Sequence, residues 1–366
     1  MNLNFIATSS VLKEGLIPAK KSFNTLMIVK IDAGKAGTFE QYTSSQQAEN
    51  NGVDGDLLTA LQVIFSQERA PYFLKIGYVA DLTSSELSIL ASATDWYFTS
   101  FLDSEMTDGN CVEVGNWLGS AKKMGVVTDV NDGALDKSAG ITKAIFDAKL
   151  DHLFAIYAPN EDNKRFVSFA LAGAMASVDF ANEDSFYTVP HLLSNIVGVD
   201  SINITPTQRA DLTGYVINVG VDPAVGIRGN FYGEYEGFDF IMEGLMPNGA
   251  LISEVAFVDW LNYTVKFDTA TYFKNNKITS YRDKDLAGII LNYKRSLLKG
   301  VRAGGLIEDQ IKTVTLQSLK DILNDSPELR SQHLLPQLTA QIKCSGAIHH
   351  VNYQAQCVPF GTELNN

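Results

Sequence analysis

Residues 72–102, YFLKIGYVADLTSSELSILASATDWYFTSFL, contain the pattern that decides the fold. Two apolar runs, Tyr72–Ala80 and Asp95–Leu102, have the length and composition of buried strands. Between them, Ser84–Ala93 is predicted to be a helix, with Thr83 or Ser84 as its N-cap. Apolar strands separated by such helices are typical of βαβ units on a mainly parallel sheet.

The same alternation continues on both sides of this segment. Toward the N-terminus we expect a strand at Phe23–Ile31 and a helix at Asp54–Gln67, where apolar residues recur at helical spacing. Toward the C-terminus the predicted elements are a helix at Cys111–Met124, a strand at Gly125–Val130, a helix at Ala139–Leu150, a strand at His152–Ala158 and a helix at Asn163–Ala181. The first part of the chain is therefore predicted to be an α/β domain.

A change of pattern near residue 222 suggests a domain boundary. Proline and glycine punctuate this region, and Gly214–Val221 is its one clear strand. Beyond it we expect two long helices, Ile252–Phe273 and Asp283–Val301, then a helix over Thr315–Asn324 and alternating strands over Gln337–Val358. The predicted division is an arm over 1–22, an α/β domain over 23–222, a second domain over 223–343 and a C-terminal strand or arm over 344–366.

Composition narrows the possible partners. The chain has 366 residues and 45% hydrophobic content, which is enough for a well-buried core. Its formal charge of −13 would repel a phosphate backbone, so nucleic acid is not an expected partner. The start lacks a basic segment typical of a signal peptide, and no apolar run approaches the roughly 20 residues that span a bilayer. We therefore expect no membrane partner and a cytosol-like compartment of synthesis.

Motifs for catalysis or metal binding are missing from the sequence. Neither GxxxxGK[ST] nor GxGxxG follows a predicted strand, and GxSxG and HExxH are absent. His349 and His350 are adjacent on a predicted strand, so their side chains would point to opposite faces. Asp129–Gly133 resembles a calcium loop, but Gly133 comes one residue early and Gly140 stands where the final glutamate is needed. We expect no catalytic residue, no cofactor and no metal site.

The three cysteines are Cys111, Cys344 and Cys357, and no two of them form a CxxC pair. Free and mostly buried thiols are the favoured interpretation. A Cys344–Cys357 bridge across a hairpin is geometrically possible, but a reducing compartment disfavours it.

A longer succession of motifs is more specific. Residues 228–244, RGNFYGEYEGFDFIMEG, are followed by Pro247-Asn248-Gly249 and by Asp259-Trp260-Leu261 at the start of a long predicted helix. This order resembles the sheath proteins of contractile bacteriophage tails. FNTLMIV near the start, FSQERAPYFLKIGY, DWYFTSFL, HLFAIYA and CSGAIHHVNYQAQCV agree with that family in the same order, so the resemblance covers nearly the whole chain. Ser253-Glu254 and Tyr232-Gly233-Glu234 depart from the family pattern.

The resemblance implies a two-domain fold, α/β and α+β. An inner α+β domain would contain both chain ends, with the outer α/β domain inserted in it, and terminal arms would add strands to neighbouring subunits. The residues assigned to this exchange are Leu3, Phe5, Ala7, Ala347, Ile348, His349, Val351 and Tyr353. Exposed strands at chain ends can pair with another sheet, although both ends could also pair within their own subunit.

The resemblance also implies a structural role without catalysis. The subunit would form homo-hexameric rings stacked as a helical polymer around a tail tube protein, with baseplate and tail terminator proteins at its ends. It would belong to the virion, after assembly in the host cytoplasm, and contraction would drive the tube through the host envelope. A contractile injection system of non-phage origin fits the same pattern. The alternative from another class is a hydrolase or small-molecule-binding protein that uses the carboxyl edge of the parallel sheet.

One helix is a candidate contact surface for the tube. In Asp283–Arg302, an apolar face is accompanied by a second stripe that contains Asn292, Arg295, Lys299 and Arg302. A basic stripe on an acidic protein suggests that this helix faces acidic residues of the tube, as the family's tube-facing helix does. The alternative is an ordinary solvated face, because basic residues also favour the C-terminal end of a helix.

Overall fold

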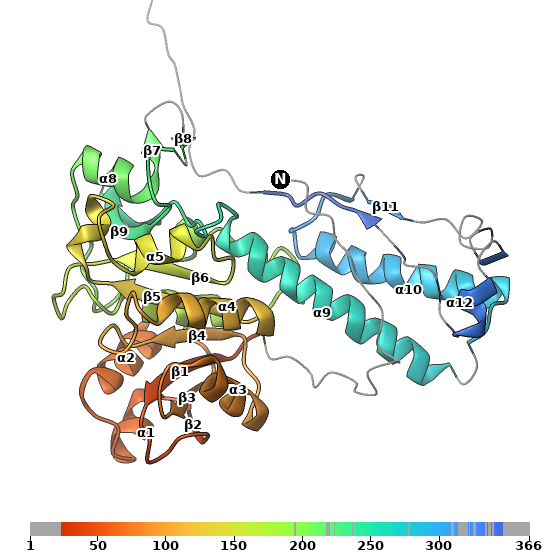
Figure 1. Cartoon of the computed structure of the whole chain (residues 1–366), viewed down its shortest axis with the longest axis horizontal. Coiled ribbons are helices and arrows are strands. Elements are labelled where there is room, and N and C mark those ends of the chain that lie inside the picture. Colours follow the sequence, from red (N-terminus) through yellow and green to blue (C-terminus); the bar gives the residue numbers. More distant parts are fainter. Residues whose placement is uncertain are drawn as a thin grey trace, which may run out of the picture.

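The computed structural model describes residues 23–346, except 194, 217–219, 223, 236, 277–278, 309–310, 314–320, 322, 325–326, 334, 336–337 and 339. Figure 1 shows an α/β body from which two long helices extend as an arm. Within the described part, no helix is both long and apolar enough to span a membrane.

The body is built on an eight-stranded sheet in the order β10-β9-β6-β5-β4-β1-β3-β2. Its strands are β1 (Leu26–Ile31), β2 (Phe39–Tyr42), β3 (Leu74–Val79), β4 (Phe98–Phe101), β5 (Met124–Asp129), β6 (Leu153–Tyr157), β9 (Asn230–Tyr235) and β10 (Phe238–Met242). All neighbouring pairs from β3 to β9 are parallel, whereas β2 and β10 are antiparallel strands at the two edges. The predicted parallel core is therefore confirmed.

Helices cover both faces of this sheet. Successive side chains of a strand point to opposite faces, so the buried strands supply apolar residues to two separate cores. Leu26 and Ile28 pack in one core with α2 (Gly55–Ser66) and α6 (Val167–Ser177). Met27 and Val29 pack in the other core with helices of the opposite layer, which are α3 (Ser84–Ala93), α4 (Cys111–Ala121) and α5 (Ile141–Asp147). Shorter elements are α1 (Ser45–Asn50), η1 (Asp132–Leu135), α7 (Val189–Leu192) and α8 (Pro206–Thr213).

Two predicted elements differ from the structure. The helix predicted over Asn163–Ala181 begins only at Val167, because turns closed by the Lys164 N to Glu161 O bond precede it. The single strand predicted over Gly214–Val221 is wrong. Tyr215–Val216 (β7) and Gly220–Val221 (β8) instead pair with each other as a small antiparallel hairpin.

The sheet continues past residue 222. After the loop that follows β8, β9 joins β6 in parallel, and β10 then folds back on β9 around Gly237, whose φ of +83° suits glycine at the turn. The hydrogen-bonded sheet thus crosses the position at which the sequence suggested a boundary. The division into outer and inner domains stays a prediction.

The arm consists of α9 (Ile252–Asn275) and α10 (Asp283–Arg302), which pack against each other and confirm the two long helices predicted there. The chain continues into β11 (Lys312–Thr313), α12 (Pro327–Ser331) and β12 (Ala340–Gln341). β11 and β12 form a separate antiparallel pair. Most of the helix predicted over 315–324, and the strands predicted after residue 346, lie outside the described residues.

Candidate interaction surface

Helix α10 has one face in the core of the arm and one face in solvent. Leu286, Ile289, Ile290, Tyr293 and Leu297 are buried. Their spacing of three and four residues places them on one side of the helix, where α9 packs. Residues on the opposite side, such as Leu291, Arg295 and Leu298, are exposed.

The exposed side of α10 alternates apolar and basic residues. Leu291, Arg295, Leu298 and Arg302 follow one another at intervals of four, three and four residues, so they form one stripe, here named the α10 stripe. Leu291 is 49% exposed and Leu298 is 43% exposed. The α10 stripe therefore combines exposed apolar surface with two arginines.

The four residues predicted to face the tube do not all lie on this stripe. Arg295 and Arg302 do, and both are exposed. Arg302 lies 3.9 Å from Glu183, a distance too long for a strong pair. Asn292 is half-buried, and its backbone carbonyl oxygen accepts a hydrogen bond from Ser296 Oγ.

Lys299 is engaged within the chain. Its Nζ lies 2.8 and 2.7 Å from the two carboxylate oxygens of Asp268 on α9. Ser296 Oγ donates to the same carboxylate at 2.7 Å. Lys299 therefore links α10 to α9 through its ion pair with Asp268. The spacing that grouped Lys299 with Arg295 in the sequence does not indicate this pairing. The leucines of the stripe could have been found from their seven-residue spacing.

The predicted strand-exchange residues cannot be compared with the structure. Leu3, Phe5, Ala7, Ala347, Ile348, His349, Val351 and Tyr353 all lie outside the described residues. Their exchange between subunits stays a prediction.

The pairing of Cys344 with Cys357 also stays a prediction. Burial raises the pKa of the Cys344 thiol to about 11, and it raises the pKa of the buried Cys111 thiol to about 11.

An aromatic cluster holds the base of the arm on the body. Phe257 and Trp260 of α9 lie with their ring centres 5.7 Å apart, and each is 5.7 Å from Phe180. Tyr187 stacks on Phe180 at 5.7 Å, and Phe186 meets Phe257 edge-on at 5.4 Å. Burial is accordingly concentrated in the N-terminal part of α9, and beyond Val265 the buried residue of this helix is Ala270.

At the carboxyl edge of the sheet, several charged side chains pair with other groups of the protein. The order of strands reverses between β1 and β4, which is where open α/β sheets usually bind ligands. There, Glu105 accepts a hydrogen bond from Ile31 N at 3.0 Å and pairs with Lys30. Arg165 pairs with Asp103 and Asp56 nearby.

Asp129 at the end of β5 is also engaged. One carboxylate oxygen accepts bonds from Thr142 N and Thr142 Oγ1, each at 2.7 Å, and the other accepts from Asn131 N at 3.1 Å. Burial raises the pKa of this carboxyl, and these hydrogen bonds oppose that shift. Asp129 therefore connects two loops. Over the described positions, no cluster of His, Cys, Asp or Glu could hold a metal ion.

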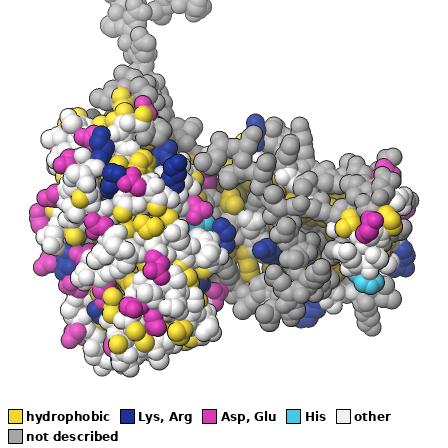
Figure 2. All heavy atoms as spheres, in the orientation of Figure 1, with side chains coloured by type: hydrophobic (Ala, Val, Ile, Leu, Met, Phe, Trp, Pro, Cys, Tyr) yellow, Lys and Arg dark blue, Asp and Glu magenta, His cyan; other side chains and the backbone are white. Residues whose placement is uncertain are grey.

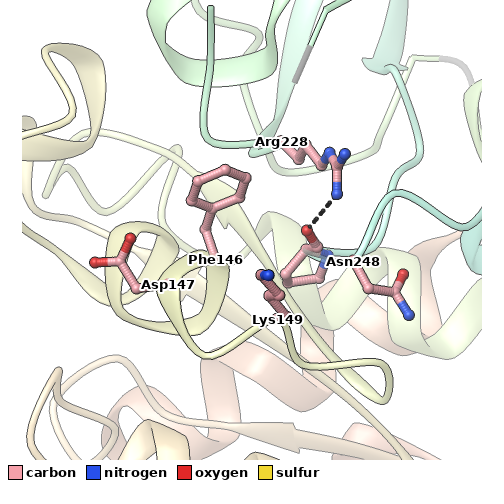
Figure 3. Close-up of a pocket in the computed structure, with 6 residues that line it drawn as sticks. Phe146, Asp147, Lys149, Arg228 and Asn248 are labelled. Carbon is pink, nitrogen blue, oxygen red and sulfur yellow. Dashed lines mark hydrogen bonds between the residues drawn. The ribbon is translucent and has the colours of Figure 1, made fainter. Parts of the chain in front are cut away.

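A small pocket lies away from this edge (Figure 3). It is lined by Phe146, Asp147, Lys149, Arg228, Pro247 and Asn248. Arg228 donates to the Pro247 carbonyl at 3.0 Å, so its guanidinium is already partly satisfied. Phe146, Asp147 and Lys149 come from the end of α5 and the turn before β6, which is the amino-terminal side of that strand. On the face of the body in Figure 2, acidic and basic side chains are interspersed.

Comparison with known proteins gives matches in structure alone. No family model matches the chain, and no curated protein matches its sequence. A chain of the contracted sheath complex of PVC, an extracellular contractile injection system, matches with a TM-score of 0.60 and 10% identity, covering 92% of each chain. A chain of the anti-feeding prophage baseplate matches with a TM-score of 0.54 and 12% identity, covering 94% of each. A sheath tail protein from Listeria innocua matches at 0.49 and 9% identity, over 81% of this chain and 89% of that one. The chain therefore shares its fold with proteins of contractile sheaths and injection systems, as the resemblance in its sequence predicted.

Proposed function

We propose that this chain is the sheath subunit of a contractile phage tail or phage-like injection system. It polymerises as stacked hexameric rings around a tail tube and contracts to drive the tube through an envelope. The observation that carries this proposal is the similarity, over 92% of both chains, to a chain of the PVC sheath complex. Such a long match includes the body and the arm together, which a shared α/β core alone would not give.

The proposed work is done by interfaces and needs no covalent chemistry. Extended and contracted lattices would differ in interface free energy, and the subunits would move between them largely as rigid bodies. The terminal segments 1–22 and 344–366 would keep the polymer continuous by adding strands to neighbouring sheets. Baseplate and terminator proteins would bind the two ends of the polymer.

The α10 stripe is the proposed contact with the tube. Arg295 and Arg302 supply positive charge to meet acidic residues, and Leu291 and Leu298 supply apolar area between them. A basic patch on a chain of charge −13 favours an acidic protein partner through charge complementarity. Lys299 contributes indirectly, because it fixes α10 on α9 through Asp268.

A hydrolase or small-molecule-binding function is less well supported. Such a fold would bind a ligand at the carboxyl edge between β1 and β4. There, Glu105 accepts a hydrogen bond from Ile31 N and pairs with Lys30. The pocket beside Arg228 lies at the amino-terminal end of β6, away from that carboxyl edge.

Electron microscopy and sedimentation of the purified protein test the function. A sheath subunit is expected to form tubes or high-mass rings, whereas a monomer or dimer at all concentrations would overturn the proposal. Deletion of residues 1–22 is expected to abolish the large assemblies and to leave the far-ultraviolet circular dichroism of the body unchanged. Assemblies that persist after this deletion would exclude a requirement for the N-terminal arm.

Charge reversal tests the tube contact. Arg295→Glu is expected to reduce co-sedimentation of sheath with tubes about tenfold or more, since a favourable charge contact becomes repulsive. Lys274→Glu, on the exposed last turn of α9, is the matched control and should leave co-sedimentation unchanged. Reversal of Lys299 is a poor test, because it would also break the pair with Asp268. Equal behaviour of both variants, with the same salt dependence as the wild type, would remove α10 from the interface.

A further inference from the structure

A buried polar cluster lies where α9 leaves the body. Asp259, on the second turn of α9, is 8% exposed. Its Oδ2 accepts a hydrogen bond from Tyr97 Oη at 2.9 Å and lies 3.0 Å from His152 Nε2. Tyr97 precedes β4, and His152 precedes β6. The Asp259 carboxylate of the arm therefore contacts two side chains, each on the residue directly before a strand of the sheet.

The second ring nitrogen of His152 also faces a carboxylate. Its Nδ1 lies 2.7 Å from Asp151 Oδ1. A neutral imidazole has one N–H, so it can donate to only one of these two acceptors. The imidazolium donates to both, and the geometry on each side of the ring is that of such a doubly protonated histidine.

The surroundings favour this charged form. Burial lowers the pKa of His152, but hydrogen bonds and charges from Asp151 and Asp259 outweigh it, so the pKa is raised above the ordinary value. The hydrogen bond from His152 lowers the pKa of Asp151, which Lys122 at the end of α4 lowers further. Tyr97 stays neutral, because burial and then Asp259 raise its pKa well above the ordinary value, and Tyr187 adds to this.

We infer that His152 is a proton-dependent clamp that fixes the base of the α9–α10 arm on the sheet. The protonated ring bridges Asp151 and Asp259. When the ring loses one proton, a nitrogen lone pair faces a carboxylate, and one of the two contacts becomes repulsive.

The direction of the pH effect follows from the raised pKa of His152. The clamp is complete below the ordinary histidine pKa of about 6.5, and it is lost as pH rises through the higher folded-state pKa. The N-terminal half of α9 should loosen once the pH exceeds this folded-state pKa, while the aromatic cluster keeps the chain folded. The clamp belongs to the single chain and does not depend on the proposed function.

Nuclear magnetic resonance of the ring nitrogens tests the protonation state. With ¹⁵N-labelled histidine, the signal missing from His152→Gln identifies His152. We expect both nitrogens to be protonated in acidic solution and the ring to lose one proton with a midpoint above about 6.5, the ordinary value for histidine. A midpoint at or below that value would overturn the inference. Each of the five histidines gives its own curve, and comparison with His152→Gln assigns the curve of His152.

Hydrogen exchange tests the mechanical consequence. In the wild type, exchange over residues 252–261, corrected for the intrinsic rate, should rise about tenfold between about pH 6.5 and about pH 8.5, equivalent to about 1.4 kcal/mol. His152→Gln keeps a side-chain donor but cannot titrate, so its exchange should show no such rise. Asp268→Asn, on the outer half of α9, is the control and should retain the wild-type pH response. An equal rise in wild type and His152→Gln would contradict the clamp.

Discussion

At the residue scale, a glycine sets how closely the end of α10 approaches α9. Gly305 is buried, and a Cβ atom at this position would lie 2.4 to 2.7 Å from three ring atoms of Phe257. The ring cannot move away easily, because Phe180, Phe186 and Trp260 surround it. The approach therefore requires a residue without a side chain.

We expect Gly305→Ala to lower the free energy of unfolding by about 1–3 kcal/mol, through overpacking against this ring. Urea denaturation measures the change. Gly109→Ala is the matched control, since a Cβ there would lie 3.6 Å from Thr107 Oγ1 in ordinary contact. Equal midpoints for the two variants would mean that the ring yields without cost.

Arg165 provides a second residue-scale prediction. Its side chain is 13% exposed and pairs with Asp103, which is 9% exposed, and with Asp56. Arg165→Met should cost about 2–4 kcal/mol, because it leaves the Asp103 carboxylate buried without this charge partner. Arg302→Met should cost less than about 0.5 kcal/mol, since that side chain is 65% exposed. Thermal or urea unfolding of both variants distinguishes the two expectations.

At the scale of the element, α10 has buried residues that hold the fold on one face and exposed residues, proposed to contact the tube, on the other. Leu297 is fully buried, whereas its neighbour Leu298 is 43% exposed and Leu291 is 49% exposed. The double variant Leu291→Ser/Leu298→Ser should change the free energy of unfolding by less than about 1 kcal/mol. It should nevertheless reduce co-sedimentation with tubes, since apolar contact area is lost.

Leu297→Ser is the counterpart on the buried face of the same helix. It should lower the free energy of unfolding by about 2–5 kcal/mol through a cavity and a buried hydroxyl. If the double variant at the exposed positions destabilised the chain to the same extent, the α10 stripe would be part of the fold and not an interface.

At the scale of the whole molecule, one hydrophobic core runs from the sheet into the arm. It includes Leu26 and Ile28 of β1, Phe257 and Trp260 of α9, and Leu297 of α10. A body and an arm that share a core should unfold together. Segment 223–343 should therefore not melt as an independent unit, whichever domain names are given to it.

The three tryptophans allow this to be measured. Trp260 reports on the joint, while Trp96 and Trp117 lie in the core on the opposite face of the sheet. In Trp96→Phe/Trp117→Phe, the fluorescence of Trp260 and the far-ultraviolet circular dichroism should give coincident urea transitions. Two separated transitions within this variant would mean that the arm folds apart from the body.

Much of the fold could be predicted from sequence, because its signals are local. Ser84–Ala93 was predicted as a helix and is α3, and the apolar runs around it are β3 and β4. Strand alternation and helical periodicity act over a few residues, so one sequence contains them in full. The strand predicted over Gly214–Val221 failed because a hairpin of two short strands has a similar composition.

The sequence by itself determined the parallel core, the two long helices and the resemblance to contractile sheath proteins. Only the tertiary structure decided that Lys299 is held by Asp268, that β9 lies beside β6, and that His152 meets Asp259, 107 residues along the chain. These pairings depend on how distant segments pack, and spacing within one element does not specify them. The proposed contact with the tube is divided in the same way: the sequence located a basic helix, and packing determined that Lys299 pairs with Asp268 while Arg295 is exposed.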